Sequence, residues 1–254
     1  MASTAGPLLN AWKPREAWTE SALREANFGE LRLIHHSSNY VFLADLEHPE
    51  HGRGLGIYKP ARGEQPLYDF PDGLYSREIA AYEFDRLLGW DLVPPTVEAE
   101  GPHGPGSLQL FIEHDPRQHY FELREHDEHD WRFIQFAAFD LAANNADRKG
   151  GHLLLDPQGD IWGIDHGLCF NAVDKIRTVI WDYAGAALPD AWVEDLRRVR
   201  GCLADGAPTA QPLLDRLAHG EAEALAARID ALVAQAVLPE MESYDRRVVP
   251  WPMI

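Results

Sequence analysis

The chain has 254 residues, enough for one large domain or for two closely packed lobes. Its 45% hydrophobic and 10% aromatic content excludes a disordered chain and supports a substantial core. The formal net charge of −18 opposes binding to nucleic-acid phosphates, and no run of Lys and Arg is present to attach the protein to an anionic membrane. We therefore expect neither nucleic acid nor a membrane as a stable partner.

Three features of the chain favour a cytoplasmic location. The N-terminus lacks the basic start and apolar stretch of a secretory signal. The most apolar stretch, Trp131–Ala143, is interrupted by Asp140 and too short to span a bilayer. The only cysteines are Cys169 and Cys202, which excludes a disulfide framework and favours a reducing compartment.

The first half of the chain is predicted to be rich in strands. Residues 1–27 are expected to form an extension or a short helix. Apolar residues alternate in 29–36, 38–46 and 54–60, a pattern typical of an antiparallel meander.

A helix and a further strand complete this half. Residues 76–88 carry the spacing of an amphipathic helix, with Ser76 placed as its N-cap and Gly89 just past its C-terminus. After a Gly- and Pro-rich turn, Leu108–Ile112 is predicted to be a buried strand.

The second half is predicted to be helical around one hairpin. A His- and acid-rich stretch, 114–129, is interpreted as a connector or an added loop. The elements expected after it are a buried helix at 130–143 that ends at the Asn144-Asn145 pair, hairpin strands at 152–156 and 161–165, and helices at 191–203 and 212–238.

Two charged residues in the first half can form a phosphate-binding pair. Lys59 ends the third predicted strand, where its ammonium can reach the phosphates of a nucleotide. Glu78 lies on the following helix and can pair with Lys59 and hold it in place. Each residue taken alone is better explained as a surface charge, and only the ordered combination favours the pair.

Two carboxylates lie at the two strand ends of the predicted hairpin. Asp147, in the loop NNADRKGGH, can accept a proton from an attacking hydroxyl. Its neighbours Arg148 and Lys149 can neutralise charge that develops on a transferred group. Asp165 ends the apolar strand IWGID, where a lone carboxylate is costly unless it holds a metal or a hydrogen-bond partner. Together they predict a metal-phosphate site.

With these four motifs in order, the sequence resembles the atypical kinases of the phosphatidylinositol 3-/4-kinase and HipA-type superfamily. IYKPARGEQPLYDFP is similar to the lysine strand of type II phosphatidylinositol 4-kinases, and SREIAAYEFDRLLGWDLVPPT to the helix that follows it. NNADRKGGH stands at the position of that family's catalytic loop, and IDHG at its metal-binding turn. The resemblance covers about residues 30–185.

The resemblance implies roles in binding ATP with Mg²⁺ or Mn²⁺. Lys59 would contact the phosphates with Glu78 as its partner, Asp147 would be the catalytic acid/base with Lys149 beside it, and Asp165 the metal ligand. The turn over the phosphates would hold Ser37, Ser38 and Asn39. The connector between the lobes, which would present its main chain to adenine, would run from Gln109 through Phe111 to Glu113.

One position departs from that family. Where it has a metal-binding Asn, five residues after the catalytic Asp, this chain has His152. Imidazole is a poor ligand for Mg²⁺ and a better one for Mn²⁺. The substitution leaves three readings open: a kinase with an altered metal site, a nucleotide-binding pseudokinase that acts as a scaffold or sensor, and an AMP-transferring enzyme.

We predict an α+β, two-lobed protein-kinase-like fold in one catalytic domain, with an N-terminal lobe at 1–113 and a C-terminal lobe at 114–254. The predicted function is transfer of the ATP γ-phosphate to a hydroxyl of a lipid, protein or small molecule. After the metal turn come Asp174, Lys175 and Arg177, and Arg177 either contacts a substrate anion or caps its own loop.

Overall fold

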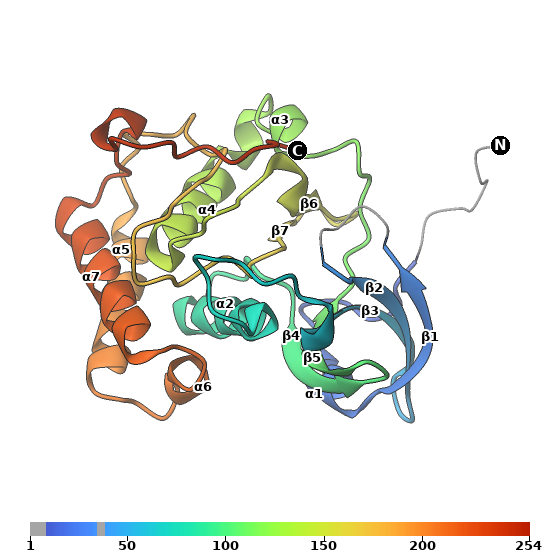
Figure 1. The fold of residues 1–254 in the computed structure, drawn as a ribbon. Coiled ribbons are helices and arrows are strands. Elements are labelled where there is room, and N and C mark those ends of the chain that lie inside the picture. Colours follow the sequence, from blue (N-terminus) through green and yellow to red (C-terminus); the bar gives the residue numbers. More distant parts are fainter. Residues whose placement is uncertain (1–8, 35–38) are drawn as a thin grey trace.

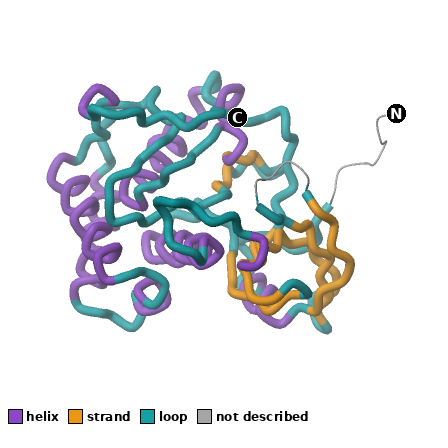
Figure 2. The backbone as a smooth tube through the Cα atoms, viewed as in Figure 1, coloured by secondary structure: helices purple, strands orange, loops and turns teal. Residues whose placement is uncertain are grey.

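The computed structural model describes residues 9–34 and 39–254. A strand-rich lobe and a helical lobe lie side by side, with helix α2 (Leu74–Leu88) near the boundary between them (Figures 1 and 2). The two-lobed, kinase-like arrangement predicted from the sequence is confirmed.

The strand-rich lobe is built on one antiparallel sheet. Its strands follow the order β1-β2-β3-β5-β4, so that Lys59 near the end of β3 pairs with Ser107 of β5. Helix α1 (Thr19–Glu25) packs against the sheet. The strands are β1 (Asn27–Leu33), β2 (Phe42–His48), β3 (Gly52–Pro60), β4 (Thr96–Gly101) and β5 (Gly104–Leu110).

The segment before α1 is part of this lobe's core. Trp12 is almost fully buried and packs among apolar side chains that include Tyr58 and Leu108. Its ring lies so close to Gly54 that a Cβ there would come within 2.2 Å of a ring atom. Gly54 is therefore required for β3 to pass beneath the Trp12 ring.

The helical lobe surrounds one large apolar core. Aromatic side chains of α4 (Asp130–Ala143) pack at its centre, with Phe139 against Phe84 of α2. A short hairpin of β6 (Leu153–Leu155) and β7 (Ile161–Gly163) follows α4. The other helices are α3 (Tyr120–Leu123), α5 (Asp190–Ala204), α6 (Gln211–Leu214) and α7 (His219–Gln235).

Helix α2 ends as predicted but begins differently. Gly89 terminates it in the left-handed conformation, with φ of 73°. The predicted N-cap at Ser76 is wrong, because the helix starts at Leu74 after Gly73. The carboxylate of Glu64 accepts the N–H groups of Gly73 and Tyr75 instead, a distant replacement for a local cap.

Three further elements differ from the expectation. The helix predicted at 212–238 is divided into α6 and α7, because Ala218 is extended and its N–H is accepted by Glu221 of the new helix. The strand expected at 108–112 instead occupies 104–110. The connector at 114–129 contains α3 and a 3-10 turn.

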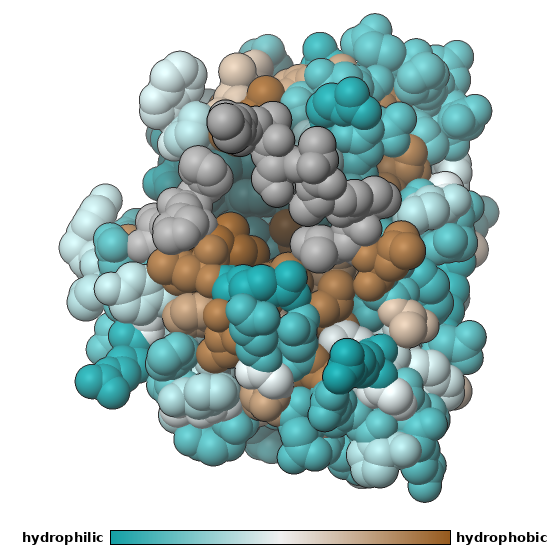
Figure 3. Space-filling model, turned by 90° about the vertical axis from the view of Figure 1, so that its right-hand side faces the viewer, coloured by the Kyte–Doolittle hydropathy of each residue, from teal (hydrophilic) through white to brown (hydrophobic). Residues whose placement is uncertain are grey.

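The surface on the side of the sheet carries both hydrophobic and hydrophilic residues (Figure 3). Hydrophobic residues gather in a band across it, within a largely hydrophilic surround (Figure 3). None of the helices in the described part of the chain has the length and apolar character needed to cross a membrane.

Candidate active site

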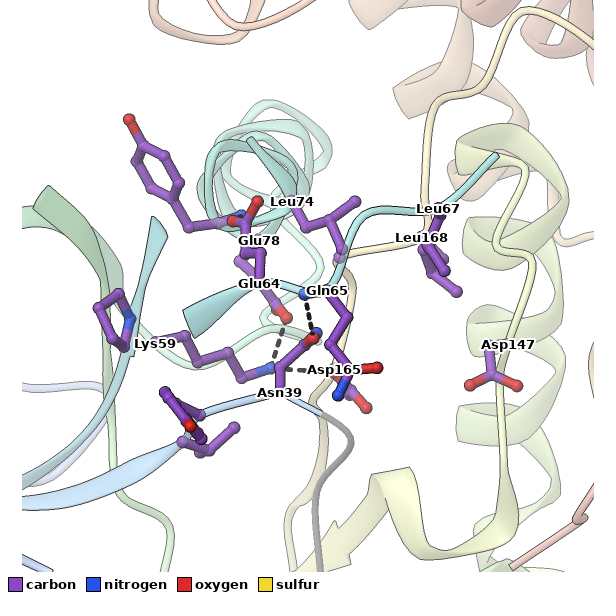
Figure 4. A pocket seen from close by; sticks show the side chains of 15 residues that line it. Asn39, Lys59, Glu64, Gln65, Leu67, Leu74, Glu78, Asp147, Asp165 and Leu168 are labelled. Atoms are coloured by element: carbon purple, nitrogen blue, oxygen red, sulfur yellow. Dashed lines mark hydrogen bonds and ion pairs between the residues drawn. The ribbon is translucent and has the colours of Figure 1, made fainter. Parts of the chain in front are cut away.

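Lys59 stands at the centre of a three-residue ion cluster. Its ammonium donates to Oε1 of Glu78 on α2 and to Oδ1 of Asp165, 2.9 Å away (Figure 4). Burial alone would lower the pKa of Lys59, but the charges of Asp165 and Glu78 outweigh it and raise the pKa above its ordinary value. Lys59 therefore remains a cation that can bind phosphate. The sequence-based pairing of Lys59 with Glu78 is present in the structure.

Glu78 connects three elements of the fold. Its side chain is almost fully buried, and Oε2 accepts the main-chain N–H of His166 at 2.9 Å. The other oxygen accepts from Lys59. Glu78 thus holds β3, α2 and the turn after β7 in one arrangement, as a structural anchor for the cluster.

Asp165 occupies the turn directly after β7 in a left-handed conformation. Its φ of 62° is uncommon for a residue other than Gly, although Asp tolerates this region better than most. The Lys59 charge holds the pKa of Asp165 far below its ordinary range, so the group is a carboxylate at every physiological pH. Half of its side chain is exposed. An ionised, accessible carboxylate of this kind fits a ligand for a divalent metal.

His152 lies against Asp165 on a short 3-10 turn (Gly150–His152). Its Nδ1 accepts the N–H of Lys149 at 3.4 Å, which leaves the hydrogen on Nε2, 3.3 Å from Oδ2 of Asp165. Burial lowers the pKa of His152 to about 4, so the imidazole is neutral. In this arrangement the Nε2–H of His152 lies beside the carboxylate that would hold the metal. The other tautomer would free Nε2 for coordination.

The loop after α4 is fixed by its asparagines. Asn144 ends the helix with φ of 52°, and its side chain bridges to the main chain of the segment at 171–175. Asn145 accepts the N–H of Asp147 and donates to the buried Asp140. The Asn pair predicted to end the helix thus also positions the catalytic candidate.

Arg148 does not face the cleft, so its predicted role in neutralising a transferred group is wrong. Its side chain is fully buried and pairs with the carboxylate of Asp140 at 2.9 Å. It also donates to the Ile164 carbonyl at 2.9 Å and contacts His166. A buried guanidinium needs partners for its donors, and Asp140, Ile164 and His166 supply them inside the lobe.

Asp147 lies on the opposite side of the cleft from Lys59 (Figure 4). Its carboxylate is about a quarter exposed and pairs with Lys149 at 3.0 Å. Burial raises the pKa of Asp147 above its ordinary value, against the opposing charges of Lys149 and Arg177. A carboxylate with a raised pKa and partial access suits a group that takes up a proton.

A cavity of about 170 Å³ joins these residues. Its lining includes Lys59, Glu78, Asp147 and Asp165. Asn39 also lines it, whereas Ser37 and Ser38, predicted beside it, lie outside the described residues. The sequence analysis assigns no role to four other residues of this lining, Tyr40, Glu64, Gln65 and Leu168, although Glu64 and Gln65 lie within the motif that contains Lys59.

The predicted connector is not part of that cavity. The N–H of Phe111 donates to Leu55, and the carbonyl of Phe111 accepts from the Asn10 side chain at 2.8 Å. The Glu113 carboxylate accepts from the main chain of Asn10 and from Lys13. The buried side chain of Gln109 donates to Thr96, at 2.8 Å. The segment before α1 thus covers one side of the connector.

The strand-rich lobe and the helical lobe together define a class of fold, the protein-kinase-like fold. The chain belongs to the same family as protein Rv2133c of Mycobacterium tuberculosis, to which it is 38% identical over 272 aligned positions, 91% of this chain and 94% of that protein. No protein-family model matches the chain.

Two solved structures are similar in fold. The structure of hydra Fam20 with sugar has a TM-score of 0.52 and 17% identity, and the match covers 86% of this chain and 87% of that one. The structure of the Helicobacter pylori proinflammatory kinase CtkA has a TM-score of 0.49 and 11% identity, over 85% of this chain and 94% of that one. The finer relation to type II phosphatidylinositol 4-kinases stays a prediction.

Proposed function

We propose that this protein is an ATP-dependent phosphotransferase that uses Mg²⁺ or Mn²⁺ and acts as one catalytic domain in the cytoplasm. The observation that carries the proposal is the double pairing of Lys59, to Glu78 and to Asp165, with Asp147 across the same cavity. A kinase needs a cation for the phosphates, a carboxylate for the metal and a carboxylate for the acceptor hydroxyl. Lys59, Asp165 and Asp147 would supply these three groups, in that order.

The donor set fits a metal that is shared with phosphate. Mg²⁺ in such sites takes one or two protein carboxylates and completes its shell with phosphate oxygens and water. Asp165 supplies one ionised carboxylate, with His152 beside it. The bound metal would neutralise charge on the phosphates. Lys59 would move part of its pairing from Asp165 to a phosphate oxygen.

Asp147 would act on the acceptor. Its carboxylate would orient the acceptor hydroxyl and receive its proton as the oxygen attacks the γ-phosphorus. The bond from the γ-phosphorus to the bridging oxygen breaks, and ADP leaves. Lys149, paired with Asp147 at 3.0 Å, would stabilise charge on the transferred group.

The position of His152 favours a second candidate. An imidazole N–H that lies 3.3 Å from the Asp165 carboxylate occupies space that a metal bound to this group would need. The same fold would then bind nucleotide weakly or without turnover, as a pseudokinase that serves as scaffold or sensor. AMP transfer is a third reading of the same cleft, in which the bond to the α-phosphorus breaks.

The products formed from ATP separate these readings. The purified protein is incubated with Mn²⁺, ATP labelled at the α- or γ-phosphate, and a deproteinised cell extract as the source of acceptors. We expect ADP and a γ-labelled product, both absent with Asp147→Asn. Pyrophosphate with an α-labelled product would mean AMP transfer, and unchanged ATP despite measurable binding would mean a pseudokinase.

A further inference from the structure

Asp147 also lines a second cavity, which is larger than the first. Its volume is about 520 Å³. Four cationic side chains line it, two from the segment after the metal turn and two from the C-terminal segment: Lys175, Arg177, Arg246 and Arg247. The only carboxylates in its lining are Asp147 and Asp174. In a chain of net charge −18, this is a local excess of positive charge.

Two of the four cations are already paired. Lys175 lies 2.9 Å from Asp69, and Arg246 lies 2.7 Å from Asp174. Their charges are therefore compensated in the folded protein. They contribute shape and hydrogen-bond donors more than net charge.

The other two cations have no carboxylate partner in the described part of the chain. Arg177 makes one long contact, from its guanidinium to the Ala146 carbonyl at 3.5 Å. Arg247 donates to the carbonyls of Val249, at 2.9 Å, and Pro250, at 3.4 Å. Guanidinium groups bind phosphate oxygens in a bidentate manner, and here two guanidinium groups without an ion-pair partner line one cavity.

The cavity is fixed relative to the catalytic candidate. The main chain of Arg177 pairs with the loop that carries Asp147, through its N–H to Asn145 at 2.9 Å and its carbonyl to Arg148 at 3.0 Å. The Arg177 charge also acts to lower the pKa of Asp147. An anion held by Arg177 would therefore lie next to the carboxylate proposed to orient the acceptor.

The C-terminal segment forms the outer wall. It runs along the helical lobe from beyond α7 and ends near α3 (Figure 1). Val248 accepts from the Thr178 main chain at 2.9 Å and from the Trp181 ring at 3.1 Å, and Met253 accepts from Gly150 at 2.8 Å. These contacts on both sides of Arg247 hold it over the cavity.

We propose that the acceptor is an alcohol that already carries a phosphate group, and that Arg177 and Arg247 bind this group while Asp147 faces the hydroxyl. This identification rests on the proposed function of the site. The negative field of the whole chain would repel an acidic acceptor. A local pair of guanidinium groups without an ion-pair partner is the feature that would overcome this repulsion. The phosphate group of a soluble molecule and that of a lipid headgroup share this chemistry.

The test measures phosphate binding without ATP, so that it does not depend on catalysis. Inorganic phosphate and glycerol phosphate are titrated into the full chain by calorimetry, against chloride at equal ionic strength. We compare wild type with Arg177→Gln/Arg247→Gln, and with a control of the same charge change at exposed sites, Arg117→Gln/Arg197→Gln. Lys59→Ala excludes phosphate binding in the nucleotide cleft.

We expect the Arg177→Gln/Arg247→Gln variant to bind phosphate about tenfold or more weakly, with wild-type affinity in the control and in Lys59→Ala. Equal affinity in the two double variants, or loss only in Lys59→Ala, would overturn the proposal. If phosphate binds through the arginines but ATP does not bind at all, the proposed function fails and the anion site stands.

A vesicle assay identifies the source of the phosphate. Phosphatidylcholine vesicles with and without phosphatidylinositol are sedimented with each protein. Sedimentation that needs phosphatidylinositol and both arginines assigns the cavity to a lipid headgroup. Binding of glycerol phosphate without sedimentation assigns it to a soluble phosphorylated alcohol.

Discussion

Asp85 on α2 allows a quantitative prediction, because its charged form is strongly disfavoured in the fold. Its side chain is 2% exposed. One oxygen accepts the N–H groups of Leu92 at 2.7 Å and Val93 at 2.9 Å, while the other has no partner in the described structure. Burial raises the pKa of Asp85 from 3.8 to about 7, against the lowering effect of these hydrogen bonds.

The sign of the effect on stability follows from proton binding. Between pH 3.8 and about 7 the folded state holds a proton that the unfolded state has lost, so the free energy of unfolding decreases as pH rises. The full change in pKa corresponds to about 4 kcal/mol, of which about 2.5 kcal/mol falls between pH about 5 and about 8. Asn at this position keeps the accepting oxygen and cannot ionise.

We therefore expect Asp85→Asn to gain about 2.5 kcal/mol relative to wild type when pH rises from about 5 to about 8. The measurement is urea unfolding followed by tryptophan fluorescence at both values. Asp205→Asn, at an exposed position after α5, controls for loss of one charge. A difference between Asp85→Asn and wild type that does not change with pH would refute the reasoning.

Three further predictions concern the site and its support. Asp147→Asn should abolish turnover and leave nucleotide affinity nearly unchanged, whereas Asp165→Asn should weaken binding of the metal-nucleotide complex. If calorimetry shows that both variants lose binding equally, the two residues do not have these separate roles. His152→Asn should shift the metal preference from Mn²⁺ toward Mg²⁺, measured by titration with each ion. Burial lowers the pKa of His152 to about 4, so the affinity of the wild-type protein for metal should not fall between pH about 8 and about 5.5. Arg148→Met should destabilise the fold by about 3–5 kcal/mol in urea unfolding, since it leaves Asp140 charged and buried, and a loss below about 1 kcal/mol would contradict this.

Much of the fold could be predicted from local pattern. Gly89 and Asn144 mark helix ends because a residue in the left-handed conformation ends a helix, whatever the helix packs against. The pairing of Lys59 with Glu78 could be predicted from their order in the chain, because Lys59 lies near the end of a strand and Glu78 lies in the first half of the helix that follows. Such inferences need only the geometry of neighbouring elements.

Other features depend on contacts between distant residues. The sequence predicts Arg148 in the cleft together with its neighbours Asp147 and Lys149. Side chains in a loop have no regular period, however, and the ion pair with the buried Asp140 places the Arg148 side chain inside the lobe. The cap of α2 comes from Glu64, outside the helix. Arg247 joins Arg177 only because the C-terminal segment folds back, and nothing in its sequence indicates this.

The central claim is that Lys59 and Asp165 hold the phosphates and metal of ATP. Crystals soaked with ATP and Mn²⁺ test it directly, because anomalous scattering locates Mn²⁺ independently of any fold argument. We predict Mn²⁺ at about 2–2.5 Å from the Asp165 carboxylate and a phosphate oxygen in contact with Lys59. Mn²⁺ and phosphates bound elsewhere, with the Lys59–Asp165 pair intact, would contradict the account.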